Sequence, residues 1–551
     1  MQEVLLVVQL FFSFIIGLYF LNLLLNSRSS KNTINRDSEK EMDRLNKMRE
    51  IKLTEPLSEK SRPKSFDEII GQENGIKALE AAICGPNPQH VIIYGPPGVG
   101  KTAAARLVLE KAKKAAKSPF GEKGRFIEID ATTIRFDDRG MADPLIGSVH
   151  DPIYQGAGAL GIAGIPQPKE GAVTKAHGGI LFIDEIGELH PIEMNKLLKV
   201  LEDRKVFLDS AYYNSEDNNI PVYIKEIFEN GYPADFRLIG ATTKSPDQIP
   251  EAIRSRCIEV YFRSLDEDEI IEIVKNAAKK INMFIEDKAI ELISRYAGNG
   301  REAVNIIQLA SSLVINEDRD MITLEDIEWV IENGKFSPRI TESINEEPKI
   351  GIVNGLAVTC ANQGRMMKIE AITKLLQDKS GSLIITGVAE KEEIKIGNST
   401  IIRKSSIMES AYSVLTVLKN TYNIDISCYD IHLHFQGGQV VDGPSAGVSI
   451  AAAIYSSIKG IKISNKIAMT GEISISGLIC PVGGVYEKIT AAKKAGCHAV
   501  IIPKDNYQAI FSKITDIKII TAEDIEQVFM SAFINDICPK TDMLSAKRSV
   551  I

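Results

Sequence analysis

Eight consecutive residues have the types and spacing needed to bind the phosphates of a nucleotide. They are Gly95, Pro96, Pro97, Gly98, Val99, Gly100, Lys101 and Thr102. In such a run the glycines let backbone N–H groups wrap around phosphates, the lysine reaches the β- and γ-phosphate oxygens, and the hydroxyl joins Mg²⁺. The run lies between an expected strand, Val91–Tyr94, and an expected helix, Ala103–Lys114, so it predicts a site for ATP and Mg²⁺.

Two acidic residues follow another apolar run. Residues Ile180–Ile183 read as a buried strand, and Asp184 and Glu185 come directly after it. An acidic pair at a strand end is often only a helix cap. The phosphate-binding loop upstream favours a hydrolytic role, in which Asp184 holds Mg²⁺ together with Thr102 and Glu185 polarises the attacking water.

A serine and a lysine in the C-terminal part of the chain could form a hydrolase centre. Ser445 lies in the run 443–447, and Lys488 follows 43 residues later. A serine directly before the expected helix Ala446–Ile458 is by default an N-cap. The same position suits a nucleophile, because free N–H groups and the dipole at a helix start stabilise an oxyanion.

Lys488 is the candidate base for that serine. In the helical run that it opens, Ala491, Ala492 and Ala495 share its face. A lysine on a packed face is desolvated, and burial can lower a pKa by up to about 3–5 units. The neutral amine that results could take the serine proton near neutral pH without a histidine or an aspartate.

Two histidines offer a further, weaker signal. His432 and His434 lie two residues apart and therefore share one face of an expected strand. Metal ligation and structural hydrogen bonding both fit that spacing. The lack of a third ligand in a recognisable motif favours hydrogen bonding.

The elements that position these groups predict an α/β fold class with more than one domain. From Phe66 to Phe262, short apolar strands alternate with helical stretches, as in a parallel sheet wrapped by helices. Residues 266–335 contain acid-rich helix starts followed by amphipathic runs, which predict a small helical bundle. Residues 350–535 mix strands and helices and predict a third, α+β domain.

The composition favours a multidomain globular protein and gives no sign of a nucleic-acid-binding or disulfide-rich one. The chain has 551 residues, 44% of them hydrophobic and 25% charged, which fits two to four globular domains. A net charge of −8 gives no sign of general nucleic-acid binding. The 7 cysteines are odd in number and scattered, so neither a disulfide framework nor a structural zinc site is expected, and the bulk of the chain fits a reducing compartment.

The N-terminus predicts a membrane anchor. No charged residue occurs from Val4 to Leu25, a stretch that as a helix would measure roughly 33 Å, against a hydrocarbon core of about 30 Å. A cleaved signal peptide is the alternative, but the run is long for one and lacks a small-residue cleavage site. Arg28, Lys31 and Arg36 follow the run while Glu3 precedes it, so the positive-inside rule predicts a single-pass cell-membrane protein with its later domains in the cytoplasm.

The nucleotide-binding half resembles the AAA+ ATPases. Besides the loop and the acidic pair, the segment Phe66–Gln72 resembles the one that leads into the AAA+ domain. The resemblance implies that Thr243, rather than Thr242, senses the γ-phosphate, that Arg256 is the arginine finger, and that Arg301 in a helical lid is a second sensor. An arginine finger acts on the neighbouring subunit's nucleotide, so the family implies a ring, a homohexamer.

The C-terminal half resembles the Lon-type proteases. Residues 442–447, 469–473 and 481–488 resemble the three signature blocks of that family, which implies that Ser445 and Lys488 form a catalytic dyad. With an anchor first, the order is most similar to LonB-type enzymes of endospore-forming bacteria, although the large N-terminal substrate-binding domain of common cytosolic Lon enzymes is missing. The resemblance implies an ATP-dependent serine endopeptidase acting on polypeptides. The expected divisions are anchor 1–30, linker 31–60, AAA+ α/β domain 61–264, helical lid 265–340, protease domain 345–535 and tail 536–551.

Several alternatives stay open. The chain could instead be a membrane-bound AAA+ remodelling factor or regulator with a non-catalytic protease-like domain, although an intact Ser445 and Lys488 argue against it. DNA association accompanies proteolysis in some Lon enzymes, and nothing in this sequence indicates it. The flexible stretch 154–161, with Tyr154, fits a substrate-gripping pore loop and a plain surface loop equally well.

Overall fold

The structure is a computed structural model of the chain, and it comprises two compact units, Met1–Lys60 and Ser61–Ile551. The residues that it describes are 14–17, 19, 41–50, 55–134, 143–150, 166–210, 213–216, 220–339, 344, 347–358, 364–377, 380–387, 391–396, 399–436 and 443–534.

The N-terminal unit contains helical residues 41–50 and the short helix α2, Leu57–Lys60. Among the helices of the described residues, none has both the length and the apolar character needed to cross a membrane. The span predicted over Val4–Leu25 lies outside the described residues, apart from residues 14–17 and 19, which are helical.

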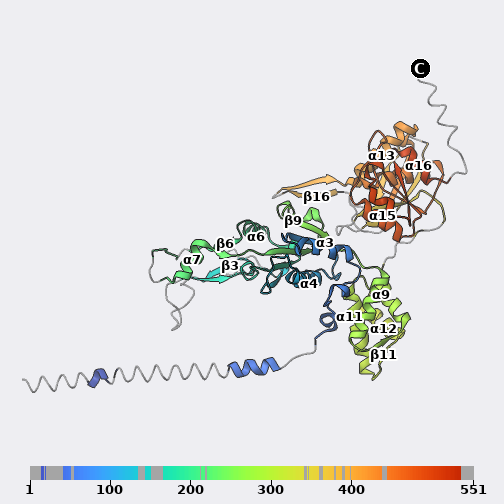
Figure 1. Cartoon of the computed structure of the whole chain (residues 1–551). Helices are drawn as coiled ribbons and strands as arrows, with labels where there is room; N and C mark the ends of the chain where they lie inside the picture. Colours follow the sequence, from blue (N-terminus) through green and yellow to red (C-terminus); the bar gives the residue numbers. More distant parts are fainter. Residues whose placement is uncertain are drawn as a thin grey trace, which may run out of the picture. The chain divides into compact units, whose positions relative to one another are not determined.

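A five-stranded parallel sheet forms the core of the nucleotide-binding half, as the alternation of strands and helices predicted (Figure 1). Its strand order is β2-β5-β8-β1-β9, with β2 at Phe126–Asp130, β5 at Ile180–Asp184, β8 at Arg237–Thr242, β1 at His90–Tyr94 and β9 at Cys257–Tyr261. The three inner strands are almost wholly buried, because a parallel sheet is covered on both faces and its central strands become continuous apolar runs.

Helices and short antiparallel strand pairs accompany this sheet in the nucleotide-binding half. The helices are α3 (Glu73–Ile83), α4 (Lys101–Lys114), α5 (Ala172–Lys175), α6 (Pro191–Asp203), α7 (Val222–Asn230) and α8 (Glu251–Arg254), with 3₁₀ turns at Phe66–Glu68, Ala131–Thr133, Ile186–Glu188 and Pro246–Gln248. Antiparallel pairing joins β3 (Gly147–His150) to β4 (Gln167–Glu170) and β6 (Lys205–Val206) to β7 (Tyr232–Pro233). The stretch 154–161, which fits a pore loop or a surface loop, lies outside the described residues.

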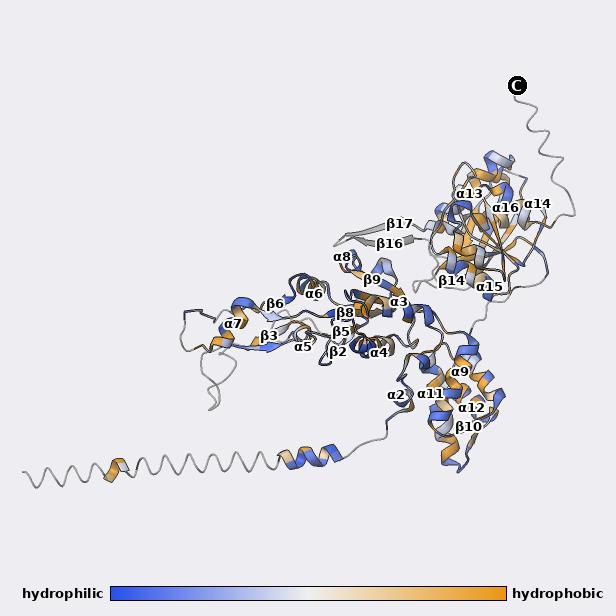
Figure 2. Ribbon diagram, in the orientation of Figure 1, coloured by the Kyte–Doolittle hydropathy of each residue, from blue (hydrophilic) through white to orange (hydrophobic). Residues whose placement is uncertain are grey.

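A helical bundle follows, as the amphipathic pattern predicted. It consists of α9 (Glu267–Lys280), α10 (Asp287–Tyr296), α11 (Gly300–Asn316) and α12 (Leu324–Gly334), with β10 (Phe284–Ile285) pairing β11 (Met321–Ile322). Figure 2 shows apolar and polar residues alternating along α9, α11 and α12, as expected for helices with one buried face. Capping boxes fix the starts of two of these helices, with Asp266 capping α9 and Thr323 capping α12.

The C-terminal half is built on a seven-stranded mixed sheet. Its order is β15 (Leu383–Thr386), β18 (Tyr429–Phe435), β14 (Gly364–Leu375), β13 (Ile352–Val358), β20 (Ile467–Met469), β23 (Ala499–Pro503) and β24 (Lys518–Ala522). Two-stranded pairs join β12 (Lys349–Ile350) to β19 (Lys462–Ile463), β16 (Lys391–Ile396) to β17 (Ser399–Lys404) and β21 (Glu472–Ile473) to β22 (Ile479–Cys480). The helices are α13 (Ser406–Tyr422), α14 (Gly447–Lys459), α15 (Val485–Lys494) and α16 (Ile525–Ala532), with 3₁₀ turns at Ile426–Cys428, Pro444–Ala446, Lys504–Asn506 and Ala509–Lys513.

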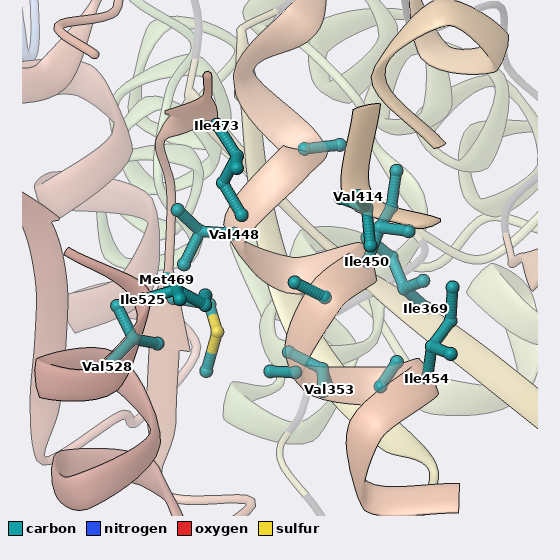
Figure 3. Packing of buried hydrophobic residues seen from close by; sticks show 14 of the residues in the cluster. Val353, Ile369, Val414, Val448, Ile450, Ile454, Met469, Ile473, Ile525 and Val528 are labelled. Carbon is teal, nitrogen blue, oxygen red and sulfur yellow. The ribbon is translucent and has the colours of Figure 1, made fainter. Parts of the chain in front are cut away.

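Two apolar cores cover opposite faces of this sheet. Figure 3 shows Val448, Ile450 and Ile454 of α14 packed among buried side chains of the sheet, α13 and α16. The core on the other face contains Val485 and Ile489 of α15. Neighbouring strand residues alternate between the two cores, so Met469 contributes to the first and Ala468 to the second. The helix that follows Ser445 and the helix that carries Lys488 therefore lie on opposite sides of the sheet.

Candidate functional site

The predicted nucleotide-binding residues meet at one edge of the five-stranded sheet. Because β1, β5 and β8 are parallel neighbours, their carboxyl ends lie together, with Tyr94 opposite Thr242 and Ile183 opposite Gly240 in the ladders. The phosphate-binding loop leaves β1 at Gly95, and the acidic pair closes β5. This is the crevice where ligands bind to open parallel sheets.

The loop has the backbone conformation that phosphate binding needs. Gly98 and Gly100 have φ of +72° and +93°, a region that side chains rarely adopt. Lys101 is 7% exposed, and its Nζ donates to the carbonyl oxygens of Gly95 and Pro96, the latter at 3.0 Å. Burial lowers the pKa of Lys101, against the attraction of Glu185 and Asp184. A cation held inside a glycine loop suits an anionic ligand such as a triphosphate.

Oxygen ligands for a divalent cation lie beside the loop. The hydroxyl of Thr102 donates to Oδ2 of Asp184 at 3.5 Å, and the N–H of Glu185 donates to Oδ1 of Asp184 at 3.1 Å. A hydroxyl and a carboxylate that converge on one point are the hard ligands that Mg²⁺ prefers, usually with waters and phosphate oxygens. The residues present therefore fit Mg²⁺ bound together with a nucleotide.

Glu185 is tied to the end of the neighbouring strand. Its backbone is left-handed, with φ of 48°, and its Oε2 accepts from both the N–H and the hydroxyl of Thr243 at 3.1 Å. Thr242 is fully buried, and its hydroxyl oxygen accepts from the N–H of Lys244 instead. Of the two threonines, Thr243 is the one that contacts the acidic pair.

The lid brings its second-sensor candidate to the loop. Arg301 is the second residue of α11, whose N-cap Asn299 accepts from the N–H of Glu302 at 3.0 Å. The side chain of Asn299 lies against Gly98, where an added Cβ would come within 2.6 Å of its Oδ1. The charge of Arg301 is also among those that lower the pKa of Lys101. Arg301 therefore lies near the phosphate-binding loop of its own chain.

Arg256, by contrast, lies away from that loop. It directly precedes β9, and the first residue of β9, Cys257, pairs with His90 at the start of β1. Arg256 therefore lies at the N-terminal ends of these parallel strands, whereas Gly95 lies at their C-terminal ends. Its guanidinium donates to the carbonyl of Ala252 at 2.6 Å and to the carboxylate of Glu202. The side chain is 38% exposed.

Ser445 and Lys488 are joined through a residue to which the sequence analysis assigned no role. The Nζ of Lys488 donates to the hydroxyl of Thr470 at 3.1 Å, and that hydroxyl donates to the carbonyl oxygen of Ser445 at 3.3 Å. The N–H of Gly471 donates to the same carbonyl at 3.0 Å. Thr470 directly follows β20, so the end of this central strand connects elements from the two faces of the sheet.

Thr470 could be noticed in the sequence only as a member of the run 469–473. It is separated by 25 residues from Ser445 and by 18 from Lys488. It is fully buried, so its hydroxyl must be satisfied inside the protein. Only the fold makes it a partner of both residues.

The local environment of Ser445 differs from the expected one. The 3₁₀ turn Pro444–Ala446 contains Ser445, and α14 begins only at Gly447 with Ala446 as its N-cap. The expectation that the helix starts at Ala446 with Ser445 as its cap is therefore wrong. Gly443 takes a φ of +130°, which starts this turn, and Ser445 is half-buried one step before the helix.

The environment of Lys488 agrees with its spacing in the sequence. The side chain is 2% exposed, and Ala491, Ala492 and Ala495 are buried beside it on the same helical face. Burial lowers the pKa of Lys488 from 10.5 to about 8, and Glu487 opposes this lowering. About one molecule in 11 of this amine is therefore neutral at pH 7, far more than for an ordinary lysine.

The two histidines share one hydrogen-bonding partner. His432 Nε2 and His434 Nδ1 lie 3.1 Å and 2.9 Å from the hydroxyl of Thr386. In the part of the chain that the structure describes, no group of three or more His, Cys, Asp or Glu residues could hold a metal ion. The arrangement agrees with structural hydrogen bonding.

Comparison with known proteins places both halves in families. Residues 91–265 match the ATPase family associated with various cellular activities, and residues 321–535 match the Lon protease (S16) C-terminal proteolytic domain. The chain is 60% identical over 528 residues to Lon protease 2 of Bacillus subtilis, a match that covers 96% of this chain and 95% of that protein. It is 31% identical over 432 residues to the archaeal Lon protease of Thermococcus kodakarensis, covering 70% of this chain and 64% of the relative. Lon protease 1 of Bacillus subtilis is 29% identical over 470 residues, covering 80% of this chain and 53% of the relative. With a nucleotide-binding sheet and a buried lysine linked to Ser445 on one polypeptide, the chain belongs to the Lon family of ATP-dependent serine proteases.

Proposed function

We propose that this protease cuts polypeptides with a dyad of Ser445 and Lys488. The observation that carries this assignment is the burial of Lys488, at 2% exposure, together with its link through Thr470 to the backbone of Ser445. A buried amine that is partly neutral can act as a base, and Thr470 gives it a fixed direction.

The chemistry follows from these groups. The neutral amine of Lys488 takes the proton from the Ser445 hydroxyl while the Ser445 oxygen attacks a peptide carbonyl carbon. The positive end of the α14 helix dipole stabilises the negative charge that develops on the carbonyl oxygen, because the N–H groups of Gly447 and Val448 already donate to the carbonyls of Pro444 and Gly471. The ammonium of Lys488 then gives its proton to the leaving amine, and an acyl-enzyme remains. Water hydrolyses this ester by the same route, with Lys488 again the base.

For the ATPase half we propose that residues 95–102 hold the triphosphate and that Thr102 and Asp184 hold Mg²⁺. The bound nucleotide supplies the free energy that drives unfolding of the polypeptide substrate. Glu185, held by Thr243, orients the attacking water, and Arg301 senses the nucleotide from the lid. Arg256 lies at the far edge of its own sheet, which supports a role at the nucleotide of a neighbouring subunit and hence a ring, a homohexamer. Light scattering in the presence of ATP and Mg²⁺ should give the mass of six chains, and a monomer or dimer would contradict the ring.

We also propose that residues 4–25 anchor the protein in the cell membrane and leave both catalytic halves in the cytoplasm. The uncharged run of residues 4–25 and the basic residues after it support this proposal. Fractionation of cells that express the whole chain tests it. Recovery of the intact protein in the soluble fraction, without detergent, would contradict it.

The central experiment is casein degradation by the full-length protein in detergent micelles, with and without ATP and Mg²⁺. We expect ATP-stimulated cleavage that Ser445→Ala abolishes while ATPase activity continues. Glu185→Gln is the matched control in the other half, and it should retain nucleotide but fail to degrade a folded protein substrate that is assayed beside casein. Persistent cleavage by the Ser445→Ala variant would contradict the dyad.

A further inference from the structure

A cluster of four polar side chains joins the phosphate-binding strand to the segment that carries Arg256. Its centre is the carboxylate of Glu259 on β9. Oε1 accepts from Nε of Arg254 at 2.8 Å and from the hydroxyl of Tyr94 at 3.4 Å, and Oε2 accepts from the hydroxyl of Tyr261 at 2.7 Å. We call Tyr94, Arg254, Glu259 and Tyr261 the Glu259 cluster.

The two tyrosines make this cluster rigid. Tyr94 is 1% exposed, and its ring stacks on that of Tyr261 with the centroids 5.2 Å apart. Burial raises the pKa of both phenols, so their hydroxyls remain donors at physiological pH. Burial would raise the pKa of Glu259, but hydrogen bonds from Arg254 and Tyr261 outweigh it, and the carboxyl stays ionised. Three donors on one charged carboxylate form a network that is stronger than an exposed ion pair.

The positions of the cluster members in the chain are informative. Tyr94 is the last residue of β1, and Gly95 of the phosphate-binding loop comes next. Arg254 is the last residue of α8, two positions before Arg256. Glu259 is therefore bonded both to Tyr94, which directly precedes the phosphate-binding loop, and to Arg254, at the start of the turn that carries Arg256.

The two neighbouring arginines have different partners. The guanidinium of Arg254 pairs with Glu259 and its side chain is 33% exposed, whereas Arg256 pairs with Glu202 and its side chain is 38% exposed. A side chain that must reach another subunit needs an open path and a firmly placed backbone. Arg256 is partly exposed, and the pair of Arg254 with Glu259 ties the end of α8, two residues before Arg256, to β9.

We propose that Glu259 is a positioning residue for ATP hydrolysis. Through Arg254 it sets the turn that carries Arg256, and through Tyr94 it ties this turn to the phosphate-binding loop of the same subunit. The nucleotide site of one subunit is thus connected to the arginine that acts on the next. This inference rests on the proposed role of Arg256 at a neighbouring subunit's nucleotide.

Steady-state ATPase kinetics of the full-length protein with Glu259→Gln test the proposal. Glutamine keeps the size and can accept from Tyr261, but it loses the charge that holds Arg254. We expect kcat to fall by about tenfold or more, because a catalytic group misplaced by about 1 Å can cost on the order of 10²-fold. KM for ATP and the affinity for a fluorescent ATP analogue should change less than about twofold, since the loop residues are untouched. Glu251→Gln, at the exposed first residue of α8, the helix that carries Arg254, is the matched control and should behave as wild type.

The double variant Glu259→Gln/Arg256→Ala separates positioning from general damage. If Glu259 acts through Arg256, the double variant should turn over no more slowly than Arg256→Ala alone. Additive losses, or a normal kcat for Glu259→Gln beside a defective Arg256→Ala, would overturn this inference and leave the role of Arg256 intact. A normal kcat for Arg256→Ala would overturn the proposed role of Arg256 and this inference with it. If Glu259→Gln does not fold, Arg254→Gln makes the same test from the other side of the bond.

Discussion

The pH dependence of peptide cleavage tests the assignment of Lys488 as a base. Burial lowers the pKa of this lysine from 10.5 to about 8. At pH 7 an ordinary lysine is neutral in about 1 molecule in 3,000, whereas one with a pKa near 8 is neutral in about 1 in 11, a gain of roughly 300-fold. The cleavage rate should follow the neutral fraction, rising about tenfold from pH 6 to pH 7 and levelling off by about pH 9.

The assay is cleavage of an unstructured fluorogenic peptide by the full-length protein at saturating ATP and Mg²⁺, with ATPase activity recorded on the same samples. Dividing cleavage by ATPase turnover removes the pH dependence of the motor. Lys488→Arg is the matched control, because a guanidinium stays charged over the whole range. This variant should hydrolyse ATP normally and cleave at no pH.

Three results would refute the reasoning. A normalised profile that is flat between pH 6 and pH 9 would show that no group with a pKa near 8 limits cleavage. Cleavage by Lys488→Arg at any pH would show that the base is another residue. A midpoint near 6.5 would point instead to a histidine.

Three further outcomes follow from the same contacts. Lys488→Met should abolish cleavage yet raise the free energy of unfolding of the protease half by up to about 3 kcal/mol at pH 7, which corresponds to lowering the pKa of a lysine from 10.5 to about 8. Because the pKa of Lys488 is lower in the folded state than in the unfolded state, the charged amine destabilises the fold fully below pH 8 and progressively less towards pH 10.5. Calorimetry at pH 7 and pH 9.5 should therefore show a smaller stabilisation by the substitution at the higher pH. Thr470→Val should lower kcat for peptide cleavage by about tenfold or more with KM little changed, because two hydrogen bonds of about 1 kcal/mol each are lost; unchanged peptidase kinetics would contradict the link to Ser445. Thr243→Val should lower ATPase kcat less than Glu185→Gln does, because the backbone N–H of residue 243 still holds Glu185; an equal or greater loss in a steady-state assay would contradict that order.

Much of the fold and both candidate centres could be predicted from the sequence, because they are encoded in patterns of neighbouring residues. Apolar runs between helical stretches predicted the parallel sheet, and residues 95–102 stand in the strand-to-helix context that binds phosphates. Helical periodicity alone put Lys488 on the apolar face where the structure buries it. In each case the determining residues are neighbours along the chain.

The remaining features needed the tertiary structure, because they are contacts between distant residues set by strand register and packing. The hydrogen bonds of Thr470 depend on two helices that cover opposite faces of one sheet. Strand register decides that Thr243 and not Thr242 holds Glu185, and that Glu259 pairs with Arg254 and not with Arg256. Even the turn around Ser445, expected to be a helix cap, is determined by the contacts of its carbonyl with Thr470 and Gly471. The sequence by itself determined the reacting and phosphate-binding groups, because their motifs and helical periodicity involve residues close together in the chain. The tertiary structure decided which other side chains support these groups, because burial and hydrogen bonding depend on residues that are distant in the chain.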